Sequence, residues 1–274
     1  MLSLRGFYFI ILLVFFEFGR SRVDRERDDS LIRFIICMLF VIVFLIVTIP
    51  VLFVLWIIGM FNPDLKFRVY QRMAQWALRV IGSLSGARVT VIGEEKIPRD
   101  TPVLYVGNHR SFFDIILSYP HCPGPTGFIV KKEMEKIPLL NIWIRNVHSL
   151  FLDRTDIKQG LKTILAGIAQ IKSGTSMYIF PEGTRNKTDG PILPFHGGSF
   201  KLAEKSRCPI VLVAATNSAA IWEDHMPRVR RANVILEYSD PIYLDQLPEE
   251  DRRHIDNYCH DLLQEMTDRN RSLV

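Results

Sequence analysis

The stretch Val103-Leu-Tyr-Val-Gly-Asn-His-Arg-Ser-Phe-Phe-Asp114 organises the chain. It begins as an apolar run of β-branched and aromatic residues, which predicts a buried strand, and it breaks at Gly107-Asn108, a turn signal. His109 and Asp114 follow the break. A histidine ring titrates at about 6.5 when unperturbed, so a strand-end histidine oriented by a carboxylate is a candidate general base. The other interpretation is a surface histidine and a helix-capping aspartate, since residues five apart do not share a helix face.

A second stretch, Met177-Tyr-Ile-Phe-Pro-Glu-Gly-Thr-Arg185, has the same layout of a short apolar strand and an abrupt polar turn. Gly183 lets the backbone approach a ligand closely, Thr184 supplies a hydroxyl, and Arg185 offers a planar fork that matches phosphate oxygens. Open α/β sheets bind ligands at their strand ends, so this turn, which also carries Glu182, is a candidate anion site. The alternative is a polar turn with its arginine in a surface ion pair.

Together the two stretches resemble the paired signature of the glycerolipid acyltransferases, most closely the bacterial-type 1-acyl-glycerol-3-phosphate (lysophosphatidate) acyltransferases. The resemblance covers the chain from about Phe34 to the C-terminus, and residues 108–114 and 180–185 carry it in the family's order. It implies a membrane enzyme of phospholipid biosynthesis. Such an enzyme moves a fatty acyl group from acyl-CoA or acyl carrier protein to the sn-2 hydroxyl of lysophosphatidate, which makes phosphatidate. It also implies His109 as base and Asp114 as its orienting partner, with no metal and no cofactor besides the acyl donor.

The resemblance further implies phosphate-binding roles outside the two stretches. The family contributes an arginine from the segment before the second stretch, here Arg154, and a lysine after a strand, here Lys132 beside Lys131. The alternative for the lysine pair is a solvated charge run. Glu182 would repel phosphate, so we expect it to organise the arginines or to contact a glycerol hydroxyl.

Acyl transfer from a thioester to an alcohol needs no enzyme nucleophile, because the acceptor hydroxyl attacks directly as a base removes its proton. We expect a helix starting near Ser111 to place backbone N–H groups at the developing oxyanion. Ser111 itself is expected to cap that helix first and to take part in the site second.

The composition narrows the competing functions. The 274 residues are 48% hydrophobic and carry a net charge of +5, which suits anionic lipid, phosphate substrates or nucleic acid alike. A nucleic-acid binder would not gather its apolar residues in one uncharged block, and neither a G-x-S-x-G elbow nor a P-loop is present. The four scattered cysteines indicate neither zinc nor disulfides. The remaining alternatives are acylation of glycerol-3-phosphate or another lysophospholipid, and non-catalytic lipid binding.

The uncharged block is residues 34–60, which as a helix exceeds the roughly 30 Å hydrocarbon core of a bilayer. It predicts a transmembrane helix kinked at Pro50, or a monotopic hairpin broken there. The predicted parts are an extension with a short apolar run (1–30), the membrane helix (31–62), an amphipathic helix lying in the membrane interface or packed on the core (63–84), and the acyltransferase domain (85–274). The expected location is the cell (inner) membrane with the active site facing the cytoplasm. Five basic residues before the block and four after it do not fix that orientation.

The pattern from residue 85 onward predicts an α/β domain with a mixed, largely parallel sheet flanked by helices and preceded by the membrane-embedded segment. The strands are expected at residues 87–92, 103–107, 126–130, 148–152, 176–180, 209–215 and 233–238. The helices are expected at residues 65–83, 112–118, 139–147, 157–173, 200–206 and 249–269.

Overall fold

The computed structural model describes residues 22–274, with side chains from Asp29 onward, so the apolar run predicted at residues 7–16 lies outside the described part. A seven-stranded sheet forms its centre, in the order β1-β7-β6-β2-β5-β3-β4. All neighbouring strands are parallel except the antiparallel pair β6–β7, which confirms the predicted mixed, largely parallel sheet. The strands are β1 (Arg88–Ile92), β2 (Leu104–Gly107), β3 (Thr126–Lys131), β4 (Leu150–Leu152), β5 (Ser176–Ile179), β6 (Ile210–Thr216) and β7 (Asn233–Tyr238).

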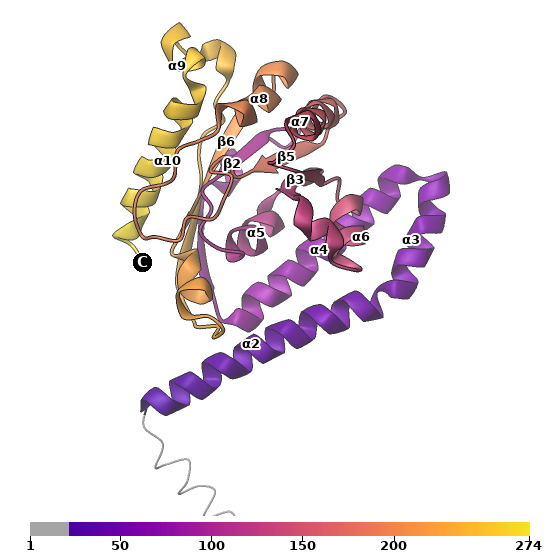
Figure 1. The fold of residues 1–274 in the computed structure, drawn as a ribbon, viewed down its shortest axis with the longest axis vertical. Helices are drawn as coiled ribbons and strands as arrows, with labels where there is room; N and C mark the ends of the chain where they lie inside the picture. Colours follow the sequence, from indigo (N-terminus) through magenta and orange to yellow (C-terminus); the bar gives the residue numbers. More distant parts are fainter. Residues whose placement is uncertain (1–21) are drawn as a thin grey trace, which may run out of the picture.

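Helices cover both faces of the sheet, so its central strands are buried on both sides (Figure 1). On one face, Leu104 and Ile210 pack in the core cluster formed with α7, α8 and α10. On the other, Tyr105 and Val211 pack in the cluster that includes Phe113 of α5. The helices of the domain are α5 (Phe113–Ser118), α6 (Leu140–Asn146), α7 (Ile157–Lys172), α8 (Lys201–Ser206), α9 (Glu249–Arg253) and α10 (Ile255–Arg271).

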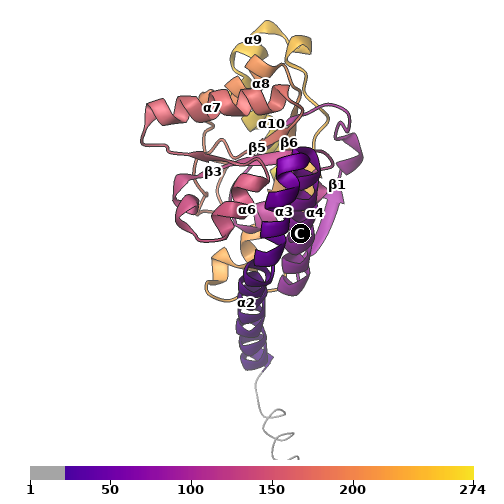
Figure 2. The same ribbon diagram turned by 90° about the vertical axis from the view of Figure 1, so that its right-hand side faces the viewer.

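The N-terminal part folds as three helices, α2 (Arg22–Val47), α3 (Ile49–Phe61) and α4 (Pro63–Ser85). The apolar block at 34–60 is not one helix, because α2 ends at Val47 and α3 begins with Pro50 in its first turn. Proline lacks the N–H that a continuing helix needs, and the Thr48 hydroxyl donates to the Phe44 carbonyl at the break. Figures 1 and 2 show α3 turning away from α2 and α4 returning alongside both. One described helix segment, Asp29–Val47, is long and apolar enough to cross a membrane by length and composition.

Helix α4 packs on the domain as well as on α2 and α3. Phe67 and Tyr70 are buried, and Gln71 and Arg79 donate to the carbonyl oxygens of Gly124 and Pro120 at 2.7 and 2.8 Å. These contacts favour the core-packing interpretation of the amphipathic pattern. Its placement in a membrane interface stays a prediction.

Two predicted elements differ from the structure. The strand expected from residue 148 begins at Leu150, because His148 has a positive φ of 57° that an extended strand does not allow. The single helix expected at 249–269 is divided into α9 and α10, because His254 leaves the helical dihedrals. The other helix and strand boundaries lie within two residues of the prediction.

Candidate functional site

The two motif turns lie side by side because β2 and β5 are adjacent and parallel, which puts both carboxyl ends at one edge of the sheet. The turns are also hydrogen-bonded to each other. The Glu182 carboxylate accepts from the His109 backbone N–H at 2.6 Å, and the Asn186 N–H donates to the His109 carbonyl at 2.7 Å. The second motif and the residue that follows it therefore fix the backbone N–H and carbonyl of His109.

His109 is held by a carboxylate and an aromatic ring. Its Nδ1 lies 2.9 Å from Asp114 Oδ2, and its ring stacks on Phe180 with centroids 4.1 Å apart. The side chain is 17% exposed, and Nε2 has no hydrogen-bond partner among the described residues. With Nδ1–H donating to Asp114, the unprotonated Nε2 is the atom that can accept a proton.

Asp114 is completely buried, and each of its two oxygens accepts hydrogen bonds. Its Oδ2 accepts from the backbone N–H groups of Arg110 and Ser111, each at 2.8 Å, as well as from His109. Its Oδ1 accepts from the Ser218 hydroxyl at 2.5 Å. The carboxylate therefore orders the backbone of residues 110 and 111 just before α5, and its role in orienting a base at His109 stays a prediction.

The predicted oxyanion site at the start of this helix is wrong. The N–H groups of residues 110 and 111 donate to Asp114, that of Phe112 donates to Glu223, and that of Phe113 donates to the Ser111 hydroxyl. None of these donors is left for a substrate oxygen, since side chains already satisfy the orphan N–H groups of the helix start. The Ser111 hydroxyl accepts from the N–H of Phe113, the first residue of α5, at 2.9 Å, while the N-cap position itself is Phe112.

Glu182 faces backbone rather than solvent. It is buried, and its second oxygen accepts from the Leu193 N–H at 3.0 Å. Burial raises the pKa of Glu182, and the two backbone N–H groups oppose that rise. The carboxylate thus organises the loops around His109. A contact of Glu182 with substrate stays a prediction.

Arg185 lies next to the loop of residues 108–112 that follows β2. Its guanidinium sits 4.1 Å above the ring of Phe112, and its Nη1 bonds to Glu223 Oε1 at 3.2 Å. The side chain is about one third exposed, at 35%. An arginine fixed over an aromatic ring with part of its fork accessible is a suitable partner for a phosphate group.

The other predicted phosphate ligands divide into two places. Arg154 lies by the turn at Gly183, whose φ of 72° favours glycine, and both line a cavity of about 390 Å³. Lys132 forms an ion pair with Asp153 at 2.9 Å and lines a neighbouring cavity together with Arg154. Thr184 is exposed. The two described cavities that Arg154 lines do not include Arg185, so the structure brings Arg154 to the motif turn but on another side of it.

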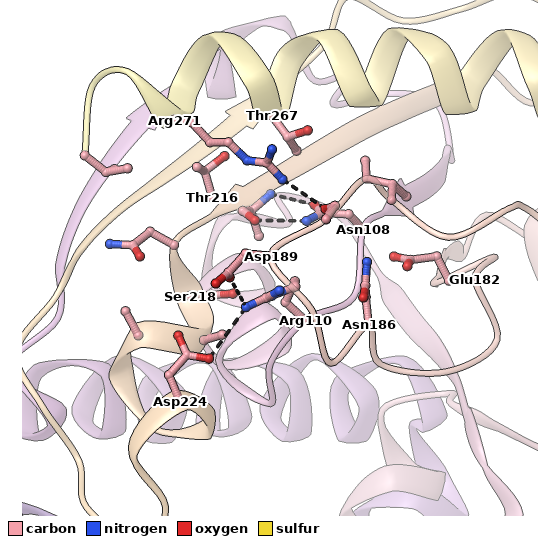
Figure 3. Close-up of a pocket in the computed structure, with 17 residues that line it drawn as sticks. Asn108, Arg110, Glu182, Asn186, Asp189, Thr216, Ser218, Asp224, Thr267 and Arg271 are labelled. Carbon is pink, nitrogen blue, oxygen red and sulfur yellow. Dashed lines mark hydrogen bonds and ion pairs between the residues drawn. The ribbon is translucent and has the colours of Figure 1, made fainter.

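The segment Trp222-Glu223-Asp224 is part of the site, although it carries no sequence signal that marks it. Trp222 packs on Phe112 with ring centroids 5.7 Å apart, and Glu223 accepts hydrogen bonds from the Ser111 hydroxyl and the Phe112 N–H. Asp224 and Asp189 pair with Arg110 at 3.5 and 2.6 Å across a polar cavity of about 360 Å³ (Figure 3). Only a contact between distant parts of the chain reveals these roles.

An apolar cavity of about 270 Å³ adjoins the loop of residues 108–112 at Phe112. Side chains of α2, α4, α5, β3 and α6 line it, and all but one of them are hydrophobic or aromatic. Its walls include Phe40, Phe44, Ala74, Leu78, Ile116 and Trp143. Such a cavity suits an alkyl chain, because burial of methylene groups against apolar side chains is favourable.

The site offers no metal centre in the part of the chain that is described: no group of three or more His, Cys, Asp or Glu side chains there could hold an ion. Among the residues of the site, the imidazole of His109 is a group that can accept a proton, and arginine and lysine side chains are groups that can bind anions.

Known proteins are similar to this chain in sequence and in fold. The acyltransferase family profile matches residues 88–216, which contain both motifs. A 1-acyl-sn-glycerol-3-phosphate acyltransferase of Haemophilus influenzae is 31% identical over 198 residues, which is 70% of this chain and 79% of the relative. This chain belongs to the acyltransferase family.

Relatives of the same name occur in eukaryotes. The protein of Cocos nucifera is 33% identical over 73% of this chain, and that of Saccharomyces cerevisiae is 29% identical over 65% of it. The matched regions span only 62% and 60% of these two relatives. The crystal structure of the acyltransferase PlsC of Thermotoga maritima has a TM-score of 0.75 at 22% identity, covering 89% of this chain and 98% of that one. This likeness confirms the fold.

Proposed function

We propose that this protein transfers a fatty acyl group from acyl-CoA or acyl carrier protein to the sn-2 hydroxyl of 1-acyl-glycerol-3-phosphate, with phosphatidate as product. The observation that carries the proposal is the position of the His109–Asp114 pair. Phe112 lies in the same short stretch as the pair, and its ring both lines the apolar cavity and lies under the guanidinium of Arg185. An acceptor with one phosphate and one hydroxyl, and a donor with one alkyl chain, match these three features. The names of the relatives from Haemophilus influenzae and Cocos nucifera support the same choice.

The reaction needs one base and one acid, and His109 supplies both. Its Nε2 accepts the proton of the acceptor hydroxyl as the oxygen attacks the thioester carbonyl, and Asp114 stabilises the imidazolium. When the carbon–sulfur bond breaks, the imidazolium returns the proton to the leaving thiolate. The new ester bond and the free thiol balance the reaction, and the histidine ends in its starting state.

Arg185 is the main proposed ligand of the phosphate. Glu223 and Phe112 hold its guanidinium in place. A phosphate bound there would keep the glycerol hydroxyl close to His109. Arg154 and Lys132, with Gly183 and Thr184, remain proposed contacts from the neighbouring cavities.

We also propose that the protein sits at the cell membrane with its site facing the cytoplasm. The helix segment Asp29–Val47 and the outward side chains of α3 support membrane contact, because large apolar residues there are exposed. Examples are Leu39, Ile46, Phe53, Trp56 and Phe61. The apolar cavity is partly walled by α2, so an acyl chain would pass from lipid to the site along that helix.

The experiment that tests the proposed reaction is an assay of the purified protein in detergent or vesicles with labelled acyl-CoA and acyl carrier protein thioesters. The acceptors are lysophosphatidate, glycerol-3-phosphate, a choline lysophospholipid and monoacylglycerol. We expect the label in phosphatidate. Turnover of glycerol-3-phosphate alone would overturn the substrate assignment, and absence of label in every product would overturn the enzymatic function.

A further inference from the structure

Glu223 joins the two motifs although it belongs to neither. It lies in the short 3-10 helix η6 (Glu223–His225), more than 30 residues beyond the second motif. Its Oε2 accepts from the Ser111 hydroxyl at 2.6 Å, and its Oε1 accepts from the Phe112 N–H at 2.8 Å and from Arg185 Nη1 at 3.2 Å. One carboxylate thus contacts both the loop that follows His109 and the arginine of the second motif.

These contacts fix Arg185 in two directions. Phe112 lies 4.1 Å from the guanidinium, while Glu223 accepts from its Nη1 at 3.2 Å. Phe112 is itself positioned by Glu223 through its backbone N–H, and by Trp222 through its ring. A free arginine side chain has several rotatable bonds, and ordering it before a ligand binds removes part of the cost of binding.

The carboxylate leaves donors of Arg185 available. Among residues 29–274, Glu223 is the only hydrogen-bond partner of the Arg185 guanidinium, and it occupies Nη1 alone. The remaining N–H groups of the fork are free for a bidentate contact with phosphate oxygens. The arrangement therefore orients the arginine and leaves its other N–H donors available for a ligand.

We propose that Glu223 is a positioning residue that presets Arg185 for the phosphate of the acceptor lipid and so sets the preference for phosphate-bearing over neutral acceptors. This inference deepens the proposed function and rests on it for the identity of the acceptor.

The Glu223→Gln and Glu223→Ala variants separate positioning from charge. The glutamine oxygen takes the place of Oε1 and accepts from Phe112 and Arg185, while its amide group meets the Ser111 hydroxyl, which turns to accept. Glutamine thus keeps every contact and removes the charge. Alanine removes the contacts. Glu250→Ala, at an exposed carboxylate in α9, is the matched control.

The test measures the dissociation constants of 1-acyl-glycerol-3-phosphate and of 1-acylglycerol in detergent micelles by calorimetry. The quantity compared is the ratio of the two constants, which a general loosening of the fold would leave unchanged. We expect Glu223→Ala to reduce the preference for the phosphate lipid about tenfold, and Glu223→Gln and Glu250→Ala to stay within about threefold of the parent protein. In an Arg185→Ala background, Glu223→Ala should cause no further loss, because it acts through that arginine.

The inference is overturned if Glu223→Ala keeps the parent preference, if glutamine fails to restore it, or if the two alanine variants lose it additively. A parent protein that binds both lipids equally would overturn it as well. Turnover in the same samples tests the proposed function separately, because binding preference for phosphate without any acyl transfer would refute only the enzymatic assignment.

Discussion

Replacement of Asp114 by asparagine tests whether the buried carboxylate supports catalysis or only orders the loop before α5. Asparagine keeps one oxygen at the position of Oδ2, where it can still accept from the N–H groups of Arg110 and Ser111. Its amide group would face the Ser218 hydroxyl, which can turn to accept. The loop geometry is therefore retained while the negative charge beside His109 is lost.

The expected effect follows from the bond at 2.9 Å between His109 Nδ1 and Asp114. A hydrogen bond to a charged group is worth about 1.5–3 kcal/mol. That energy stabilises the imidazolium formed in the transition state, and each 1.36 kcal/mol corresponds to a factor of ten in rate, so kcat should fall about 10- to 200-fold.

The assay follows initial rates of phosphatidate formation with saturating acyl donor, beside thermal unfolding of the same preparations. Ser218→Ala is the control, because it removes a hydrogen bond from the other oxygen and leaves the charge in place. An Asp114→Asn variant that folds normally and keeps kcat within about twofold of the parent value would refute the base-orienting role. Only the hydrogen bonds that order residues 110 and 111 would then remain as the role of this side chain.

Three further changes test other parts of the site. Arg185→Ala should raise KM for lysophosphatidate about tenfold or more and leave KM for monoacylglycerol unchanged, as initial-rate titrations will measure; an equal rise for both would exclude a phosphate contact. Glu182→Gln should lower the free energy of unfolding by about 1–3 kcal/mol in urea titrations, because two backbone N–H groups face this side chain and one would meet an amide NH₂ instead of an oxygen. Burial raises the pKa of Glu182 in the folded protein, so the free energy of unfolding of the parent protein falls as pH rises from the unfolded pKa of this group to the folded one. Glutamine does not titrate, so the Glu182→Gln variant should lose less stability across that pH range. The same pH dependence of the free energy of unfolding in both proteins would contradict this. Ala74→Leu should narrow the apolar cavity. An acyl donor about two methylenes longer than the narrowed cavity accepts should lose about tenfold in kcat/KM, because each methylene that is no longer buried costs about 0.8 kcal/mol. An unchanged dependence of kcat/KM on acyl-chain length would place the acyl chain elsewhere.

Much of the fold follows from local sequence signals. The seven strands were predictable because buried parallel strands are short apolar runs bounded by turn residues, as at residues 103–107 and 233–238. The break at Thr48 was harder to place, because the apolar composition of residues 34–60 is the same on both sides of it and only Pro50 marks the change.

The candidate site was predictable where both partners carry a motif, and unpredictable where one does not. His109 and Asp114 lie in one short stretch, and their contact follows from the turn between them. The expected oxyanion site is wrong because Asp114 and Glu223 occupy the backbone donors, and such competition depends on side-chain geometry that spacing does not encode. Glu223 itself stands in a segment with no periodic pattern, so only the tertiary contact identifies it.

The most direct test of a base at His109 compares His109→Ala with the parent protein in two measurements on one preparation. Transfer of labelled acyl groups to lysophosphatidate should fall about 100-fold or more, while the dissociation constant of lysophosphatidate stays within about threefold, because the alanine removes the proton acceptor and leaves the Arg185 contact in place. A variant that retains a tenth or more of the parent rate would contradict proton transfer by this imidazole.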